Sequence, residues 1–163
     1  MSGERLMAAA GIEADGALGA ALEGRAAILE MTDRSRETVL RPAEPGGLSH
    51  ALRAALAARV ARLSGETALA ERYAADLARL DPDPADAALA EPETRPEGDA
   101  RLAAMVAHLD MVATRPRAAR AADVARLTAA GVAEADIVRL SQLVAFLAYE
   151  ARVVAGLRLM GAT

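Results

Sequence analysis

The strongest helical pattern in the chain is RAADVARLTAAGVAEADIVRLSQLVAFLAYEARVVAGLRLM, Arg120 to Met160. In its second part, apolar residues recur every three or four positions, which is the spacing of one face of an α-helix. This stripe comprises Ile137, Leu140, Val144, Leu147, Ala151, Val154 and Leu157. Leu143, Phe146 and Val153 widen the apolar surface beyond one stripe. Such a helix is either central to its own domain or shared with another subunit.

The same stretch is not expected to cross a membrane. Polar and charged residues interrupt it, and charge at the middle of a bilayer is costly. These residues are Arg139, Gln142, Glu150, Arg152 and Arg158. A shorter helix over 123–130 precedes it, and Gly131 suits the left-handed position that ends a helix.

Outside this stretch, the sequence also predicts helices and no strand. Ala and Leu carry most of the 53% hydrophobic content, aromatics make up 2%, and Val and Ile follow helical spacing. Further helices are expected over 15–32, 49–64, 66–80 and 101–114, after a frayed start at 1–11. A turn or two over 35–41 precedes the loop RPAEPGG. The predicted fold class is therefore all-α, with about six helices.

A length of 163 residues predicts one domain, 1–163, with enough chain to bury a core. The segment DPDPADAALAEPETRPEGD, residues 81–99, holds four prolines and seven acidic residues. This composition predicts a solvated linker or flap.

Composition also excludes several classes of function. All 19 basic residues are Arg, the net charge is −4 and no basic cluster occurs, so nucleic acid is not an expected partner. The start of the chain has no signal-peptide pattern, which predicts a cytoplasmic protein. With no Cys, disulfides, thiolate metal sites and thiol catalysis are excluded. No histidines or carboxylates show metal-ligand spacing, and we expect neither metal nor cofactor.

Two segments carry a family resemblance: LTAAGVAEADIVRLSQLVAFLAYEARVVAGL, residues 127–157, and LSHALRAALAARVARLSG, residues 48–65. They resemble the alkylhydroperoxidase D-like / carboxymuconolactone decarboxylase superfamily. The resemblance implies a single helical bundle of the alkylhydroperoxidase D type. It also implies a homo-oligomer, from dimer to hexamer, with the long C-terminal helix in the interface.

Peroxidase members of that superfamily carry a Cys-x-x-Cys, a His one turn later and an acid about three turns upstream. Aligned on RVARLSG, the thiol positions fall on Glu66 and Leu69, the His position on Tyr73, and the acid position near Ala54. One cysteine would attack a peroxide, the other would resolve the sulfenic acid, and His and the acid would move protons. All four groups are replaced together, so a thiol peroxidase is not expected.

Several residues remain as candidates for proton transfer or substrate binding, each with a structural alternative. His108, Glu66 and Tyr149 are candidates for proton transfer. Candidates for substrate binding are Arg152, which suits a carboxylate, together with Gln142 and Tyr73. As structural alternatives, His108 is a core-edge histidine and Glu66 a favourable acid at a helix start. Tyr149 and Arg152 would be a buried pair that positions helices or a subunit contact. His50, at an exposed helix start, is interpreted as structural.

Two hypotheses of function follow. In the first, the chain is a non-catalytic or partner subunit that has lost its redox chemistry and pairs with a thiol-bearing relative. In the second, it is a small-molecule lyase or isomerase. That enzyme would use His108, Glu66 or Tyr149 for proton transfer and Arg152 to bind an acidic substrate. The second hypothesis requires His108, Tyr149 and Arg152 to converge on one pocket.

Overall fold

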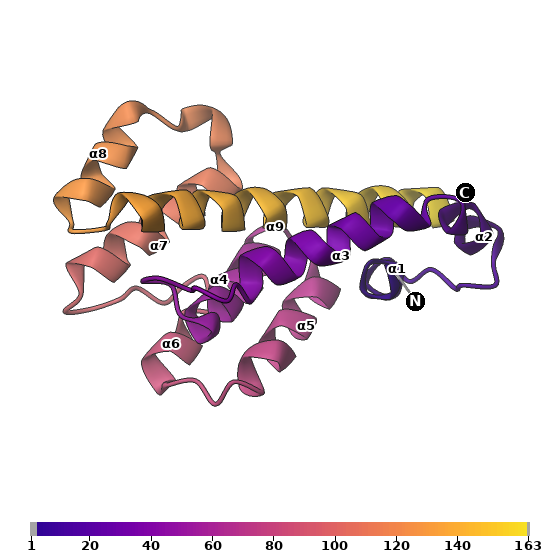
Figure 1. The fold of residues 1–163 in the computed structure, drawn as a ribbon, viewed down its shortest axis with the longest axis horizontal. Helices are drawn as coiled ribbons and strands as arrows, with labels where there is room; N and C mark the ends of the chain where they lie inside the picture. Colours follow the sequence, from indigo (N-terminus) through magenta and orange to yellow (C-terminus); the bar gives the residue numbers. More distant parts are fainter. Residues whose placement is uncertain (1–2, 163) are drawn as a thin grey trace.

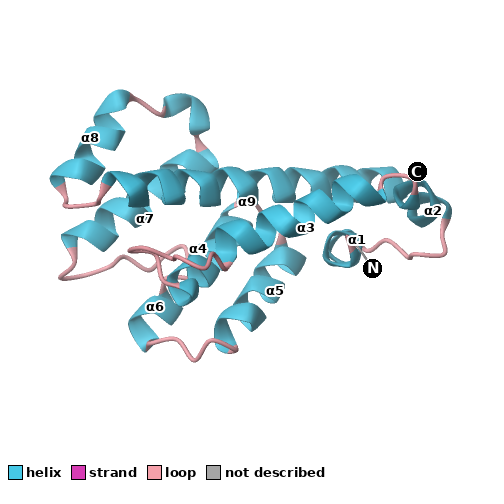
Figure 2. Ribbon diagram, in the orientation of Figure 1, coloured by secondary structure: helices cyan, strands magenta, loops and turns pink. Residues whose placement is uncertain are grey.

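The computed structural model describes residues 3–162, and this part of the chain is all-α, as predicted (Figure 2). It contains nine α-helices, one short 3-10 helix and no strand. The helices are α1 (Glu4–Ala10), α2 (Ala17–Glu23), α3 (Ala26–Leu40), α4 (His50–Leu63), α5 (Thr67–Ala78), α6 (Pro84–Ala88), α7 (Ala100–Thr114), η1 (Pro116–Ala118), α8 (Ala121–Ala129) and α9 (Glu134–Gly161). The expected number of about six helices was too low.

Helix α9 is the long central helix of the fold (Figure 1). Its 28 residues give it a length of about 42 Å at 1.5 Å per residue. Helices α1, α3, α4, α7 and α8 all pack against it, and its predicted apolar stripe is buried from Ile137 to Leu157. Buried positions outside that stripe, such as Leu143 and Phe146, show that more than one face of α9 is covered.

The N-terminal third differs most from the prediction. Residues 4–10 form helix α1, where Leu6 is fully buried and the Gly3 N–H donates to the Asp33 carboxylate at 2.9 Å. The expected helix over 15–32 is instead divided between α2 and α3, with the break at Gly24. Helix α3 then continues without interruption to Leu40. Periodicity missed the break because apolar residues keep a helical spacing on both sides of it.

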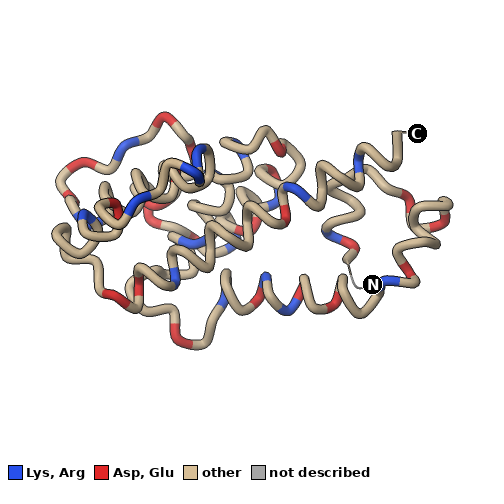
Figure 3. The backbone as a smooth tube through the Cα atoms, turned by 90° about the horizontal axis from the view of Figure 1, so that it is seen from above, with Lys and Arg blue, Asp and Glu red and all other residues tan. Residues whose placement is uncertain are grey.

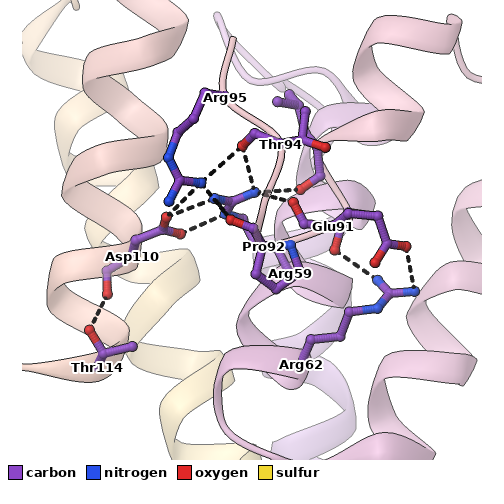
Figure 4. Close-up of polar contacts among 10 residues, drawn as sticks. Arg59, Arg62, Glu91, Pro92, Thr94, Arg95, Asp110 and Thr114 are labelled. Atoms are coloured by element: carbon purple, nitrogen blue, oxygen red, sulfur yellow. Dashed lines mark hydrogen bonds and ion pairs between the residues drawn. The ribbon is translucent and has the colours of Figure 1, made fainter.

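Most residues of the segment 81–99 are exposed, but its middle packs against the bundle. It contains α6, and Leu89 is 1% exposed. Figure 4 shows the cause, which is the fully buried Arg59 of α4. Its guanidinium donates to the carbonyl oxygens of Leu89, Glu91, Pro92 and Thr94 at 2.5–3.2 Å. It also makes a bidentate ion pair with Asp110 of α7, at 2.6 and 2.7 Å. One cation thus fixes this segment between α4 and α7.

A second buried arginine holds the loop before α4 in the same way. The Arg53 guanidinium donates to the carbonyl oxygens of Val39, Pro45 and Leu48 at 2.7–2.9 Å. Burial lowers the pKa of Arg53, and the nearby Arg139 lowers it further. Loop 41–48 therefore packs closely onto the bundle.

Charged residues of both signs are spread along the chain (Figure 3), and α3 carries both acids and arginines. Within residues 3–162, no helix has both the length and the apolar character that a membrane crossing requires.

Candidate functional site

Three helices bring ionisable side chains together in the interior of the protein. Arg36 lies on α3, Tyr73 on α5 and Glu150 on α9. One carboxylate oxygen of Glu150 accepts a hydrogen bond from Arg36 Nε at 3.0 Å, and the other accepts one from the Tyr73 hydroxyl. Glu150 and Tyr73 are each 1% exposed and Arg36 is 4% exposed. These three residues are called the Arg36–Tyr73–Glu150 cluster below.

Each member of the cluster occupies an apolar position of its own helix. Glu150 lies one turn after Phe146 and one turn before Val154, on the buried side of α9. Tyr73 lies midway between the buried Leu69 and Leu77 on α5. Arg36 follows the same spacing on α3, whose buried residues are Leu29, Thr32, Arg36 and Leu40. Helical periodicity therefore aims all three side chains at the core.

A second layer of charges surrounds the cluster. Asp33 accepts a hydrogen bond from Arg36 Nη1 at 2.7 Å. Arg5 of α1 pairs with Asp76 of α5 at 2.7 Å, and its guanidinium lies over the Tyr73 ring at 5.8 Å from the centroid. This geometry is that of a cation–π contact. Through these residues the cluster links α1, α3, α5 and α9.

The surroundings keep Tyr73 protonated and Arg36 charged. Burial raises the pKa of Tyr73 well above its usual value, and the negative charge of Glu150 raises it further. Burial alone would lower the pKa of Arg36, but Glu150 and Asp33 outweigh this effect and raise it. The cluster therefore holds one cation, one anion and one neutral hydroxyl that donates to the anion.

Little space is left beside the cluster. A cavity of about 20 Å³ adjoins it, lined by residues that include Arg36, His50, Ala54 and Tyr73. A water molecule needs roughly 10–15 Å³ measured in this way, so the cavity has room for about one. Outside it, an open groove of about 1020 Å³ runs between α1 and α3. Arg5, Arg36 and Glu37 line both spaces, so the cavity is a neighbour of this α1–α3 groove.

The four positions that the family resemblance assigned to redox chemistry are all buried. Glu66 pairs with Arg158 of α9 at 2.7 Å and is 5% exposed. Leu69 and Ala54 belong to the hydrophobic core, and Tyr73 belongs to the cluster. Glu66 immediately precedes α5, as expected for an acid at a helix start. The sequence did not predict the ion pair of Glu66 with Arg158 of α9.

The candidate residues on α9, which are Tyr149, Arg152 and Gln142, do not line the cavity or the groove beside the cluster. Tyr149 is 42% exposed, and its hydroxyl lies 2.9 Å from the Thr32 hydroxyl of α3. Arg152 is exposed and donates to the Ala148 carbonyl of its own helix at 3.0 Å. Gln142 is exposed. Tyr149 thus connects α9 to α3, and it does not form the expected buried pair with Arg152.

The two histidines lie on α7 and at the start of α4. His108 is half-buried on α7, and its Nδ1 atom has no hydrogen-bond partner among the described residues. Burial lowers the pKa of His108, and the charge of Asp123 on α8 opposes this effect. His50 Nε2 lies 2.9 Å from the Pro42 carbonyl oxygen, which fits a structural role. In residues 3–162, no hydrogen bond or ion pair joins His108 to Tyr149 or Arg152.

Sequence reasoning missed Arg36 and Glu150, although a signal for both was present. Glu150 was interpreted as a charge that interrupts the apolar helix. It lies, however, four residues from each of the buried Phe146 and Val154, so it is on the buried side of α9. A charged residue at a core position requires a partner of opposite charge on another helix. Arg36, at the core spacing of α3, is that partner. Among the described residues, no group of three or more His, Asp or Glu side chains is arranged to hold a metal ion.

Comparison with known proteins adds no family assignment, because no protein-family model and no curated protein matches this chain.

Proposed function

We propose that this chain is a partner subunit of the alkylhydroperoxidase D-like type that has lost the thiol peroxidase site and acts through assembly. One observation carries the proposal: the positions expected for the thiols, the histidine and the acid hold packed or paired side chains. Glu66 is tied to Arg158, and Tyr73 to Glu150. Beside Tyr73, the space that a reacting peroxide could enter is a cavity of about 20 Å³.

The alternative, a lyase or isomerase, gains no support from the contacts of its candidate residues. It required His108, Tyr149 and Arg152 to face one pocket. Tyr149 instead contacts Thr32 of α3, Arg152 bonds to its own helix, and His108 lies near Asp123 of α8. No observation on the described residues favours this function over assembly.

Enzymatic assay of the purified protein tests the loss of peroxidase function. We expect no hydroperoxide consumption above buffer with a dithiol reductant, while a cysteine-bearing relative serves as the positive control. Addition of this chain to that relative is expected to change the sedimentation of the mixture, because the proposed partner is a thiol-bearing subunit. Turnover by the isolated chain would contradict the proposal.

Surface area supports the assembly part of the proposal. A compact monomer of this mass is expected to expose about 7,600 Å². The chain exposes 8793 Å², an excess of roughly 1,100 Å² over that scaling. A stable interface buries about 800 Å² per partner. The excess is therefore enough for one interface of ordinary size with a second copy.

Exposed apolar side chains indicate where the second copy would bind. Ile28 and Met31 on α3 are 49% and 63% exposed, and Tyr149 of α9 is 42% exposed. They lie close together, because the Thr32 hydroxyl contacts both the Ile28 carbonyl and the Tyr149 hydroxyl. This α3–α9 edge combines an aromatic residue, a methionine and an aliphatic residue, a composition typical of interface cores.

Met31→Glu is expected to shift the protein from oligomer to monomer, because it places a charge in the proposed interface. Sedimentation equilibrium measures the mass directly. Val124→Glu on α8 is the matched control, because Val124 is also apolar and 45% exposed but lies on another helix. We expect this control to keep the wild-type mass. A wild-type protein that is monomeric throughout, or equal effects of both variants, would contradict an interface at the α3–α9 edge.

A further inference from the structure

One face of α9 is uncovered along most of the helix. Its members recur at alternating steps of four and three residues: Val138, Gln142, Ala145, Tyr149, Arg152, Gly156 and Leu159. Six of these seven residues are exposed, and Gly156 is half-buried. A repeat that averages 3.5 residues keeps a stripe turned toward one neighbouring helix, as in a coiled coil. These seven residues are called the exposed α9 stripe below.

The exposed α9 stripe is poor in charge. Arg152 is its only charged member, although 26% of the whole chain is charged. Helix α3 extends this surface on one side, where Tyr149 contacts Thr32 and where Ile28 and Met31 are exposed. Depletion of charge together with exposed aromatic, methionine and aliphatic side chains is typical of the core of an interface. The repeat and the composition therefore both indicate a helix of another subunit as the partner of this face.

The order of residues along the stripe favours the same helix of a second copy, in the antiparallel direction. The stripe runs from Val138 to Leu159, and its midpoint falls beside Tyr149. A two-fold axis that crosses α9 at this midpoint would lay the whole stripe against itself, because a two-fold interface pairs the same patch of both subunits. Val138 of each copy would then meet Leu159 of the other, so that the ends of the contact are apolar.

Side-chain size and charge agree with the antiparallel direction. Gln142 would face Gly156, where an added Cβ atom would meet no other atom within 4 Å and room for a longer side chain remains. Arg152 would face the small Ala145. A parallel pair would instead place Arg152 against Arg152, and directly opposed like charges repel each other. It would also set Gly156 against Gly156, which leaves a gap in the packing.

We propose that a second copy of this chain binds to the exposed α9 stripe, with the two α9 helices antiparallel and a two-fold axis beside Tyr149. This inference rests on the proposed function, because it assumes assembly, and it adds the identity of the partner and the direction of its helix. Ile28 and Met31 of α3 lie at the flank of the contact. The excess surface of roughly 1,100 Å² is enough for one such contact, which needs about 800 Å² from each copy.

Cysteine cross-linking tests the direction, because the chain has no cysteine of its own. Gln142→Cys and Gly156→Cys are co-expressed, mildly oxidised and compared with each variant alone. A disulfide requires Cα atoms within about 7 Å of each other, so we expect about tenfold more cross-linked dimer from the pair than from either variant alone. In the antiparallel arrangement, the two copies of residue 142 would lie about 20 Å apart along the helix axis.

Val124→Cys, exposed on α8, is the matched control and is expected to give as little product as either variant alone. Sedimentation of the reduced proteins distinguishes this inference from the proposed function. If the protein is a dimer but Gln142→Cys alone links as readily as the pair, the helices are parallel. If it is a dimer and the pair links no better than Val124→Cys, the contact lies elsewhere. Either result overturns the antiparallel α9 contact and leaves assembly standing, whereas a monomer at all concentrations would overturn both.

Discussion

Arg59→Met is expected to lower the free energy of unfolding by about 3–5 kcal/mol. Methionine fills most of the arginine volume but supplies no donor. Asp110 would lose its bidentate partner, and four carbonyl oxygens of the 81–99 segment would lose the guanidinium that they share. Denaturation in urea measures the loss, and faster cleavage of this segment by a glutamate-specific protease, at Glu93 or Glu97, should accompany it.

Arg62→Met is the matched control for that measurement. Arg62 lies on the same helix and also contacts the segment, through the Ala90 carbonyl at 2.8 Å and the Glu91 carboxylate at 3.1 Å. Its side chain is 29% exposed, so water can replace the lost partner. We expect a loss of about 1 kcal/mol or less. If the two variants lost equal stability, Arg59 would not be the residue that fixes the segment.

Glu150→Gln is expected to lower the free energy of unfolding by about 2–4 kcal/mol. The amide keeps the shape of the side chain and can still accept from the Tyr73 hydroxyl. Arg36, however, would lose its buried counter-ion and keep only Asp33, which is 32% exposed. Thermal and urea unfolding of the variant measure the effect.

A double-mutant cycle distinguishes charge from packing in this cluster. Arg36→Gln with Glu150→Gln removes both buried charges, so the double variant should lose less stability than the sum of the two single losses. Additive losses would mean that the two charges do not interact. Tyr73→Phe, which removes only the hydroxyl, should cost about 1–3 kcal/mol because it leaves a carboxylate oxygen of Glu150 without its donor.

Much of the helical architecture could be predicted from periodicity and breakers. The predicted helices over 49–64, 66–80, 101–114 and 123–130 correspond to α4, α5, α7 and α8 within two residues at each end. Ser49 caps α4, accepting a hydrogen bond from the Leu52 N–H at 3.0 Å. These helices could be predicted because the turns between them contain Gly, Pro or Ser, whose local preferences agree with the tertiary fold.

Helices α1 and α6 could not be predicted in the same way, because long-range contacts stabilise them. Helix α1 has seven residues, too few to be stable alone. It is fixed by the burial of Leu6 and by the Arg5–Asp76 pair. Segment 81–99 has the composition of a solvated linker, and its middle is held against α4 by the donors of Arg59 and Arg62 and by the burial of Leu89.

The candidate site was predicted only in part. Tyr73 was named as a candidate, but its partners Arg36 and Glu150 are separated from it by 37 and 77 positions, which no local pattern connects. Charged side chains were assigned to solvent by default. In this chain, that default fails at Arg36, Arg53 and Arg59, all at most 4% exposed.

The Arg59 contacts have a consequence for how the sequence can vary. Surface loops usually accept insertions and deletions at little cost. Between Leu89 and Thr94, however, four carbonyl oxygens must converge on one guanidinium. Loss or gain of a single residue there would move at least one of them out of reach, whereas most side chains in the stretch contribute nothing to these bonds. This piece of chain is therefore constrained in its length and free in much of its composition.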